Sequence, residues 1–348
     1  MRIATAANGN LSAARTAKKD EFYTQLVDIE KELSHYRRHF QGKIVYLNCD
    51  DPRVSNFFRY FALNFEVLGL RKLIATCYRS EDPDRFSRAD SARAVWLEYD
   101  GHKNDNQVPE ADEIGVRVLR GDGDFRSAES IELLREADIV VTNPPFSLFR
   151  EFAAQLIEHD KKFIILGNMN ALTYKEIFPL FQTNQMWYGP SIRNGDREFR
   201  VPDDYPLEAA GTRVDPEGHR YIRVKGVRWF TNLDHTERHQ DLELTRRYRA
   251  ADYPRYVNFD AIEVGKTGEI PADYDGLMGV PITFIDKYNP EQFEIVGSSK
   301  TMGQPMSEVA EKGTYQQGGP RFYLPTARGY RRMYDRIVVR NRRLAGAG

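Results

Sequence analysis

The stretch from Asp138 to Phe146 (DIVVTNPPF) decides how this chain folds. Its first five residues, Asp138 to Thr142, form a short apolar run of the kind found in buried β-strands. Asn143, two prolines and an aromatic residue follow at once, and proline holds φ near one value, so this turn is rigid. Ser147 is placed to cap a helix that runs to about Glu158. The stretch therefore predicts a strand, a fixed turn and a helix.

The same alternation extends over the first half of the chain. Short apolar runs predict strands at Lys43–Asn48, Lys72–Tyr78, Ala94–Tyr99, Val116–Leu119, Asp138–Thr142 and Lys162–Leu166. Helical spacing or caps predict helices at Asp20–Phe40, Val54–Leu68 and Ser127–Glu136, and after a capping box of Thr173 and Glu176. We expect the run that starts at Ala94 to be an edge strand. This is the pattern of an α/β fold with an open, mostly parallel sheet and helices on both faces, whose ligands bind beyond the carboxyl ends of the strands.

The rhythm changes near Gly189. The runs Tyr221–Phe230 and Pro281–Tyr288 alternate as strands do, and turn residues separate them. We therefore predict a second lobe rich in strands and loops. The expected division is a flexible arm at 1–19, a catalytic domain at 20–188 and a target-recognition region at 189–348.

Composition sets limits on function. The 348 residues are 41% hydrophobic, enough for a sizeable core, and no apolar run approaches the length of a membrane span. The polar N-terminus does not resemble a secretory signal. Cys49 and Cys77 lie in apolar surroundings without a histidine pattern, so we expect a reducing compartment and no metal site.

Charge is unevenly distributed, although its sum is only -1. The C-terminal stretch contains a single acid, Asp335, and the arginines Arg321, Arg328, Arg331, Arg332, Arg336, Arg340, Arg342 and Arg343. A local basic face of this kind suits phosphate contact, whatever the total charge. A solvated tail is the alternative interpretation.

The turn from Asn143 to Phe146 has a specific chemical logic. An exocyclic amino group on a purine is a poor nucleophile, and two acceptors aimed at its hydrogens favour a more tetrahedral, reactive nitrogen. Asn143 offers a side-chain carbonyl and Pro144 a backbone carbonyl. Pro145 adds no competing donor, and Phe146 offers a flat face on which a flipped base can stack. A rigid turn without chemistry is the alternative.

This turn resembles the catalytic motif of amino-group methyltransferases, and further motifs resemble the EcoRI-type family of adenine-specific DNA methyltransferases. Those motifs are Asp20–Thr24 (DEFYT), Tyr46–Pro52 (YLNCDDP), Gly123–Ser127 (GDFRS) and Gly279–Phe284 (GVPITF). The resemblance runs from about Asp20 to Arg340. It implies transfer of a methyl group from S-adenosylmethionine to the N6 amino group of adenine in a specific double-stranded DNA sequence, with base flipping. It also implies a bacterial cytoplasm or nucleoid, or a phage origin, and pairing with a restriction endonuclease.

The resemblance implies a donor site built from three stretches and shared with Asn143. Its other residues are Phe22, Tyr23, Thr24, Asn48, Cys49, Asp50, Asp51, Asp124 and Phe125. Asp50 or Asp51 would accept from ribose hydroxyls or face the ammonium, and Asp124 and Phe125 would hold the adenine. Each aspartate also has a structural alternative, Asp124 as a turn former and Asp50 as a helix cap. The loop after the first strand lacks glycine and no acid ends the second strand, which departs from the wider superfamily.

The second lobe remains for target recognition. Arg223, Lys225, Arg228, Arg331 and Arg332 are our candidates for DNA contact, because arginine and lysine serve phosphates. Two rival functions stay open: an amino-group methyltransferase acting on RNA or on protein glutamine, and a DNA-binding protein without catalysis. A nucleotide-dependent oxidoreductase is disfavoured, since no G-x-G-x-x-G follows the first strand.

Overall fold

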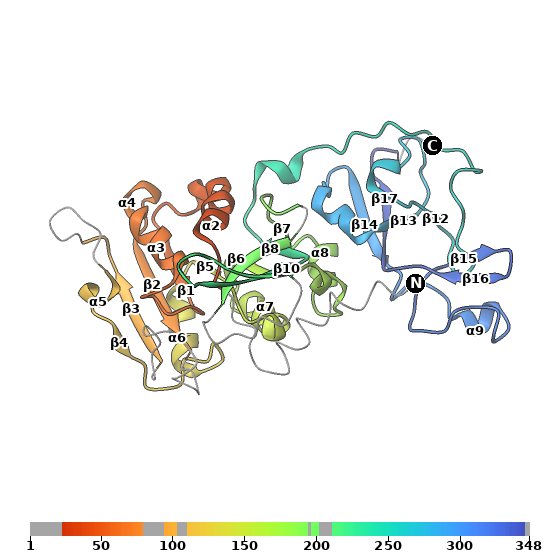
Figure 1. Ribbon diagram of the computed structural model, residues 1–348. Helices are drawn as coiled ribbons and strands as arrows, with labels where there is room; N and C mark the ends of the chain where they lie inside the picture. Colours follow the sequence, from red (N-terminus) through yellow and green to blue (C-terminus); the bar gives the residue numbers. More distant parts are fainter. Residues whose placement is uncertain (1–22, 79–93, 103–109, 194–195, 202–210, 345–348) are drawn as a thin grey trace. The chain divides into compact units, whose positions relative to one another are not determined.

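The computed structural model describes residues 23–78, 94–102, 110–193, 196–201 and 211–344. It divides the chain into two compact units (Figure 1). The first comprises Met1–Glu176 and Tyr188–Asp234, and the second comprises Ile177–Trp187 and His235–Gly348. This division differs from the expected boundary at residue 189, because the chain returns to the first unit and adds strands there before it finally leaves.

An eight-stranded sheet forms the centre of the first unit, in the order β4-β3-β2-β1-β5-β6-β11-β7. Its strands are β1 (Ile44–Leu47), β2 (Lys72–Cys77), β3 (Val95–Tyr99), β4 (Arg117–Val118), β5 (Ile139–Thr142), β6 (Lys162–Asn168), β7 (Trp187–Tyr188) and β11 (Val227–Thr231). Pairing is parallel from β2 through β1 and β5 to β6. The carboxyl ends of these four strands therefore share one edge, as the sequence predicted.

The expected edge strand lies inside the sheet. β3 pairs antiparallel with β2 on one side and with β4 on the other. The strand predicted at Val116–Leu119 is β4, and its two ladder residues pair on the outer side of β3. Apolar runs indicate where strands lie but not the order in which they pair, so the prediction of the edge was wrong.

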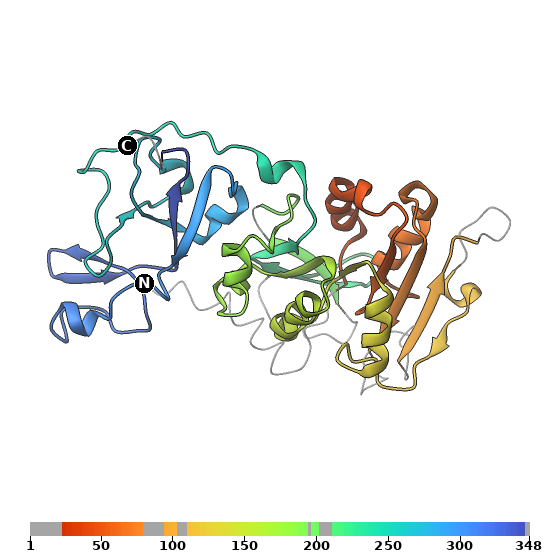
Figure 2. The same cartoon turned by 180° about the vertical axis from the view of Figure 1, so that it is seen from behind.

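Helices cover both faces of this sheet (Figures 1 and 2). They are α2 (Leu26–Leu33), α3 (Asn56–Leu63), α4 (Phe65–Leu68), α5 (Ala111–Ile114), α6 (Ala128–Glu136) and α7 (Phe149–Glu158). Val45 and Leu47 join the apolar core made with α2, α3 and α4. Tyr46 points to the other face, where Ser130 of α6 interacts with its hydroxyl. Helices on both faces are confirmed.

Two predicted caps are wrong. Ser147 lies inside a 3-10 turn, η3 (Phe146–Leu148), and α7 begins only at Phe149. Thr173 ends another 3-10 turn, η4 (Met169–Thr173), where its hydroxyl donates to the carbonyl of Asn170 at 2.9 Å. The next helix, α8 (Phe178–Gln182), therefore starts without a side-chain cap.

Two predicted helices are also shorter than expected. The first α-helix ends at Leu33 and continues as a 3-10 helix, η1 (Ser34–His39). The second is interrupted at Asn64, between α3 and α4. Asn64 donates its side-chain amide to the carbonyl of Tyr60, which competes with the helical pattern of backbone bonding.

A small antiparallel sheet completes the first unit, with β8 (Asp196–Val201), β10 (Arg220–Lys225) and β9 (Thr212–Val214) in that order. The expected single strand Tyr221–Phe230 is two strands. Gly226 between them has φ +71°, which glycine adopts without strain. The chain turns there, so that β10 pairs with β8 and β11 pairs antiparallel with β6.

The second unit contains a four-stranded sheet in the order β12-β13-β17-β14 and a two-stranded hairpin, β15-β16. Its strands are β12 (Ile262–Glu263), β13 (Met278–Pro281), β14 (Phe293–Ser298), β15 (Tyr323–Thr326), β16 (Gly329–Arg332) and β17 (Arg336–Asn341), and α8, η5 (Thr236–His239), η6 (Thr267–Glu269) and α9 (Met306–Val309) accompany them. The expected strand Pro281–Tyr288 is wrong: a 3-10 helix, η7 (Ile282–Lys287), follows β13 and buries Phe284 and Ile285.

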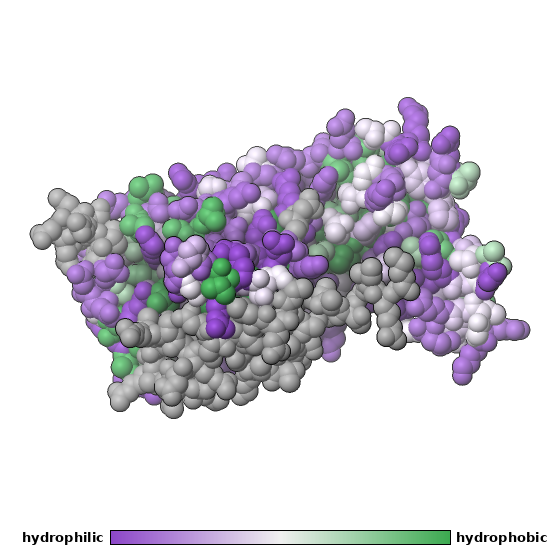
Figure 3. All heavy atoms as spheres, viewed as in Figure 1, coloured by the Kyte–Doolittle hydropathy of each residue, from purple (hydrophilic) through white to green (hydrophobic). Residues whose placement is uncertain are grey.

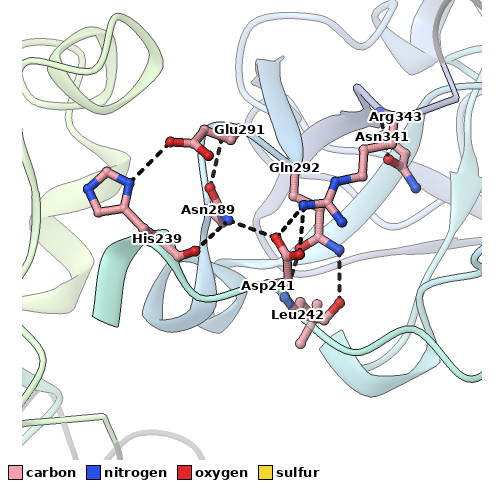
Figure 4. Close-up of polar contacts among 8 residues, drawn as sticks. All are labelled: His239, Asp241, Leu242, Asn289, Glu291, Gln292, Asn341 and Arg343. Carbon is pink, nitrogen blue, oxygen red and sulfur yellow. Dashed lines mark hydrogen bonds and ion pairs between the residues drawn. The ribbon is translucent and has the colours of Figure 1, made fainter. Parts of the chain in front are cut away.

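Two features fix the interior of the second unit. Arg336 and Glu263, 8% and 7% exposed, form a buried ion pair in which Arg336 Nε lies 3.1 and 3.0 Å from the carboxylate oxygens. Gln292 imitates a backbone partner: its Oε1 accepts from the Leu242 amide at 2.7 Å and its Nε2 donates to the Leu242 carbonyl at 2.8 Å. Figure 4 shows this bonding, which orders the extended chain that follows η5. In the part of the chain that the structure describes, no helix has the length and apolarity to cross a membrane.

Candidate active site

The loop after β1 provides two carboxylates with different environments. Asp51 is buried, and Arg53 compensates its charge. The backbone amide and the Nε of Arg53 both donate to Oδ1 of Asp51 at 2.9 Å. Asp50 accepts only from the Ser55 hydroxyl, at 3.3 Å, among the described residues. Ser55, not Asp50, is the N-cap of α3. Asp50 is therefore the carboxylate that remains available to a ligand.

Burial raises the pKa of the Asp50 carboxyl from 3.8 to about 7, and the neighbouring charge of Asp51 also raises it. The Ser55 hydrogen bond acts in the opposite direction. A cation or hydroxyl donor placed here would stabilise the ionised form. The side chain is thus suited to contact the positively charged or hydroxyl-bearing part of a ligand.

Two buried oxygens close to this loop have no hydrogen-bond partner among the described residues: Oγ1 of Thr24 and Oδ1 of Asn48. The two stretches are joined, since Asn56 at the start of α3 donates to the Thr24 carbonyl at 2.8 Å. Unsatisfied buried acceptors are costly and call for a partner. The ribose hydroxyls and the ammonium of S-adenosylmethionine are donors of the right kind, so these residues fit the donor that the sequence implied.

The third stretch reaches the same edge of the sheet through a glycine. Gly123 has φ +77°, and a Cβ there would lie 2.3 Å from the carbonyl oxygen of Cys77 at the end of β2. Only glycine permits this approach. The next residue, Asp124, is bonded through Oδ1 to Arg126 Nε at 2.8 Å, and this contact holds the pKa of Asp124 below its usual 3.8. Phe125 is buried.

The Asn143–Phe146 turn, which the sequence predicted to be catalytic, lies at the end of β5, next to β1. Tyr46 of β1 is opposite Val140 of β5 in the parallel ladder, so the loops that follow the two strands begin side by side. Asn143 is 7% exposed and Pro144 is also buried. Phe146 is only partly buried and packs against the core. The turn therefore places its carbonyl acceptors beside the loop of Asn48 and Asp50.

Most of the residues expected to bind the methyl donor lie in the first unit. Cys49 is half-buried and Tyr23 forms an isolated bridge with Arg200 of β8. Phe22 lies outside the described residues. The sequence did not single out Arg126 or Gln155, which contact the Asp124–Phe125 loop from its own end and from α7.

The residues predicted to contact DNA differ in their exposure. Arg223 and Lys225 project from β10 and are exposed. Arg228 is 3% exposed, and its guanidinium donates to the carbonyls of Val227 and Arg193, both at 2.8 Å. We correct that prediction: β11 is buried on both faces, so Arg228 is a structural residue.

The C-terminal arginines are better compensated than the local sequence indicated. Acids distant in the chain bind three of them: Arg336 pairs with Glu263, Arg340 with Glu294 and Arg343 with Asp241. Figure 4 shows the last of these. Arg321 pairs with Asp335. These arginines hold the second unit together.

Of the eight arginines of the predicted basic face, four form no ion pair among the described residues: Arg328, Arg331, Arg332 and Arg342. Arg331 and Arg332, the two candidates for DNA contact, differ. Arg331 is exposed, and no acid pairs with it within the described ranges. Arg332 donates to the Gly319 carbonyl from Nη2 at 3.0 Å and from Nε at 3.3 Å. Arg331 is the more available of the two for a phosphate.

One group of side chains could in principle hold a metal ion. Ligand atoms of Asp215, Glu217 and His219, in the turn between β9 and β10, lie within 4.8 Å of one another. Asp215 already accepts from the amide of His219 at 2.8 Å and the hydroxyl of Tyr221 at 3.1 Å. We assign this group to turn formation.

We expect Asp50→Asn to change the pH dependence of stability. The pKa of Asp50 is raised to about 7 by folding, so the native state holds this proton between the unfolded value of 3.8 and about 7. Stability of the wild type then falls as pH rises through that window. Asn removes the cost of a buried carboxylate, and the variant should gain on the order of 2 kcal/mol near pH 8 and almost nothing near pH 4. Urea unfolding at both pH values measures this, and an equal gain at both would contradict it.

Comparison with known proteins agrees with the resemblance. A sequence model of the family described as adenine-specific methyltransferase EcoRI matches residues 10–342. The type II methyltransferase M.EcoRI of Escherichia coli is 51% identical over 312 residues, which cover 89% of this chain and 95% of that protein. M.MgeORF184P of Mycoplasma genitalium is 39% identical, covering 82% and 85%, and M.MpnI of Mycoplasma pneumoniae is 39% identical, covering 81% and 83%. The chain therefore belongs to the EcoRI family of adenine-specific methyltransferases.

Proposed function

We propose that this chain transfers a methyl group from S-adenosylmethionine to the N6 amino group of adenine in a specific double-stranded DNA sequence, with the target base flipped out of the duplex. One observation supports this most directly. The Asn143–Phe146 turn, with its two carbonyl acceptors, stands at the carboxyl end of β5 beside the loop after β1 that has an unpartnered acceptor and an available carboxylate.

The donor would be held by three stretches of the first unit. Thr24 and Asn48 would accept hydrogen bonds from it, Asp50 would serve its ribose hydroxyls or ammonium, and Asp124 and Phe125 would hold its adenine. Arg126 competes for the Asp124 carboxylate. When bound, S-adenosylmethionine supplies a methyl group activated by its sulfonium.

The catalytic turn acts on the nucleophile. The Asn143 side-chain oxygen and the Pro144 carbonyl accept the two amino hydrogens of the flipped adenine, which turns the nitrogen lone pair toward the methyl carbon. The N–C bond forms as the S–C bond breaks, and one amino proton is then lost to solvent through these acceptors. The partly exposed ring of Phe146 is available for the base to stack on.

DNA would contact exposed cations outside the donor site. Arg223 and Lys225 on β10 and Arg331 on β16 are exposed and suit phosphates. We assign target recognition mainly to the second unit. On the face drawn in Figure 3, the coloured surface of that unit is mostly hydrophilic or neutral. A bacterial cytoplasm or nucleoid is part of this proposal and is supported by the bacterial source of the relatives, and their type II names favour a partner restriction endonuclease.

A transfer assay with labelled S-adenosylmethionine tests the proposal. Equal amounts of double-stranded DNA, RNA and protein are offered, and the DNA is digested to nucleosides. We expect label only in DNA, in the nucleoside N6-methyldeoxyadenosine. Label in RNA or in glutamine would replace this function by one of its rivals, and tight DNA binding without donor binding would indicate a protein that has lost catalysis.

Arg331 gives a prediction on DNA binding. Arg331→Ala should weaken binding to cognate and unrelated duplexes alike and reduce the slope of log affinity against log salt by about 1, because one counterion-releasing contact is lost. Arg340→Ala is the matched control, since Arg340 on the neighbouring β17 is paired with Glu294. Titrations at several salt concentrations measure both slopes. An unchanged slope for Arg331→Ala would remove it from the DNA-binding surface.

A further inference from the structure

Helix α7 begins three residues after the catalytic turn and contacts the donor loop through one side. Gln155 Nε2 donates to the carbonyl oxygen of Phe125 at 2.9 Å. The ring of Phe152 meets the ring of Phe125 edge to face, with centroids 5.2 Å apart. Glu151 accepts from Nη1 of Arg126 at 2.9 Å. Positions 151, 152 and 155 share one side of a helix, so all three side chains contact the same loop.

Gln155 is the buried member of this set. It is 9% exposed, whereas Glu151 and Arg126 meet at the surface. Its Oε1 atom is buried without a hydrogen-bond partner among the described residues. Burial of an amide with one end unsatisfied is unfavourable, and an apolar residue of the same size would avoid it. What the amide contributes is its bond to Phe125, which lies away from any helix or strand ladder.

We propose that Gln155 is a positioning residue for the methyl donor. Through its bond to the Phe125 carbonyl, it holds the Phe125 ring against the adenine of S-adenosylmethionine. This inference rests on the proposed function, in which Phe125 contacts that adenine. It also connects two parts of the site: only the short 3-10 turn η3 links the Asn143–Phe146 turn to α7, so the acceptors for the target base and the anchor for the donor lie close together in the chain.

A positioning role for Gln155 predicts which step of the reaction is impaired when its hydrogen bond to Phe125 is lost. The bond acts on the donor loop and not on the acceptors at Asn143, so its loss should weaken donor binding and leave the chemical step intact. In Gln155→Met, which keeps the length of the side chain and removes the donor, we expect the Kd and KM for S-adenosylmethionine to rise about tenfold, which corresponds to about 1.4 kcal/mol. The kcat at saturating donor and the KM for DNA should stay within about twofold.

Adenine-bearing fragments sharpen the test. S-adenosylhomocysteine and 5′-methylthioadenosine share the adenosine part and differ at the amino-acid end. Calorimetry with both should show the same fractional loss in Gln155→Met, since the lost contact concerns the adenine. The matched control is Gln182→Met: Gln182 Nε2 also donates to a backbone carbonyl, that of Val296 at 2.8 Å, but within the second unit. That variant should bind both ligands as the wild type does.

A structural role for Gln155 would give a different result. Gln155→Met would then melt at lower temperature while binding both adenosine ligands with wild-type affinity, which overturns the inference. A fall in kcat at saturating donor as large as the rise in KM also overturns it. If Gln155→Met does not fold, Gln155→Glu tests the same bond at pH about 8, where its carboxylate cannot donate to Phe125. A wild type that fails to bind S-adenosylhomocysteine would instead refute the proposed function, and the inference with it.

Discussion

Asn143→Ala should lower the rate of adenine methylation by two to three orders of magnitude, about 3–4 kcal/mol of transition-state stabilisation. The substitution removes the side-chain carbonyl that accepts an amino hydrogen of the target, and water does not replace a preorganised acceptor at a site 7% exposed. Single-turnover kinetics with donor and DNA in excess measure the chemical step directly.

Two comparisons separate this effect from damage to the fold. Asn143→Asp keeps an oxygen acceptor in the same place and should retain far more activity than Asn143→Ala. Calorimetric binding of S-adenosylhomocysteine should be close to that of the wild type in both variants, if the donor stretches are intact. Near-normal turnover in Asn143→Ala would show that this residue is not the acceptor, and the catalytic mechanism would have to be abandoned.

Glu263→Ala should destabilise the protein by about 3–5 kcal/mol, because it leaves the guanidinium of Arg336 buried without its counter-charge. The Tyr256 hydroxyl loses one of its two acceptors at the same time and keeps the Gly279 carbonyl at 3.3 Å. The pair joins β12 to β17 across 73 positions of sequence, so the loss would loosen the sheet of the second unit. Urea unfolding followed by circular dichroism measures the change.

Glu294→Ala is the matched control, because its partner Arg340 lies on the same strand, β17, as Arg336. The Arg340–Glu294 pair is 43% and 36% exposed, and exposed pairs contribute about 0–1 kcal/mol. A double change of Glu263→Leu with Arg336→Met should recover much of the loss of Glu263→Ala, since neither charge is then left alone. Equal costs for Glu263→Ala and Glu294→Ala would mean that burial of the first pair is not what makes it important.

The strands of the parallel sheet were predictable because each has its own signal. β1, β2, β5 and β6 are buried on both faces and read as continuous apolar runs. Their parallel pairing then brought the loop of Asp50 and the turn of Asn143 to one edge of the sheet. Chain order and physical rules were sufficient for this much of the site.

What could not be predicted depends on backbone angles and distant partners. Arg228 follows Arg223 and Lys225 in what reads as one run, but the turn at Gly226 ends the half-exposed strand β10, and Arg228 lies in the fully buried strand β11. The carboxylate of Asp51 is already bound by both ends of the Arg53 guanidinium. A list of acidic residues does not reveal this pairing.

Long-range pairing was equally hidden. Arg336, Arg340 and Arg343 read as a basic face because their acids lie 73, 46 and 102 positions away in the sequence. Thr24 and Asn48 were expected from the family resemblance, and the burial of their unpartnered oxygens among the described residues adds a structural reason to expect a ligand there. The sequence indicated candidate residues, whereas the folded chain shows which of them already have partners.

The chain enters the second unit twice, at Ile177 and again at His235, and this limits how the protein can be divided into fragments. A fragment that stops at the end of the catalytic stretch near residue 188 would lack β11, the antiparallel neighbour of β6, and would leave that strand with an open edge prone to self-association. A fragment that stops at Asp234 keeps β11 but retains α8 without the β14 strand against which it packs. An isolated fragment of the first unit therefore requires a short flexible replacement for residues 177–186, which spares β7, as well as an end at residue 234. The order of the motifs along the chain does not suggest this design.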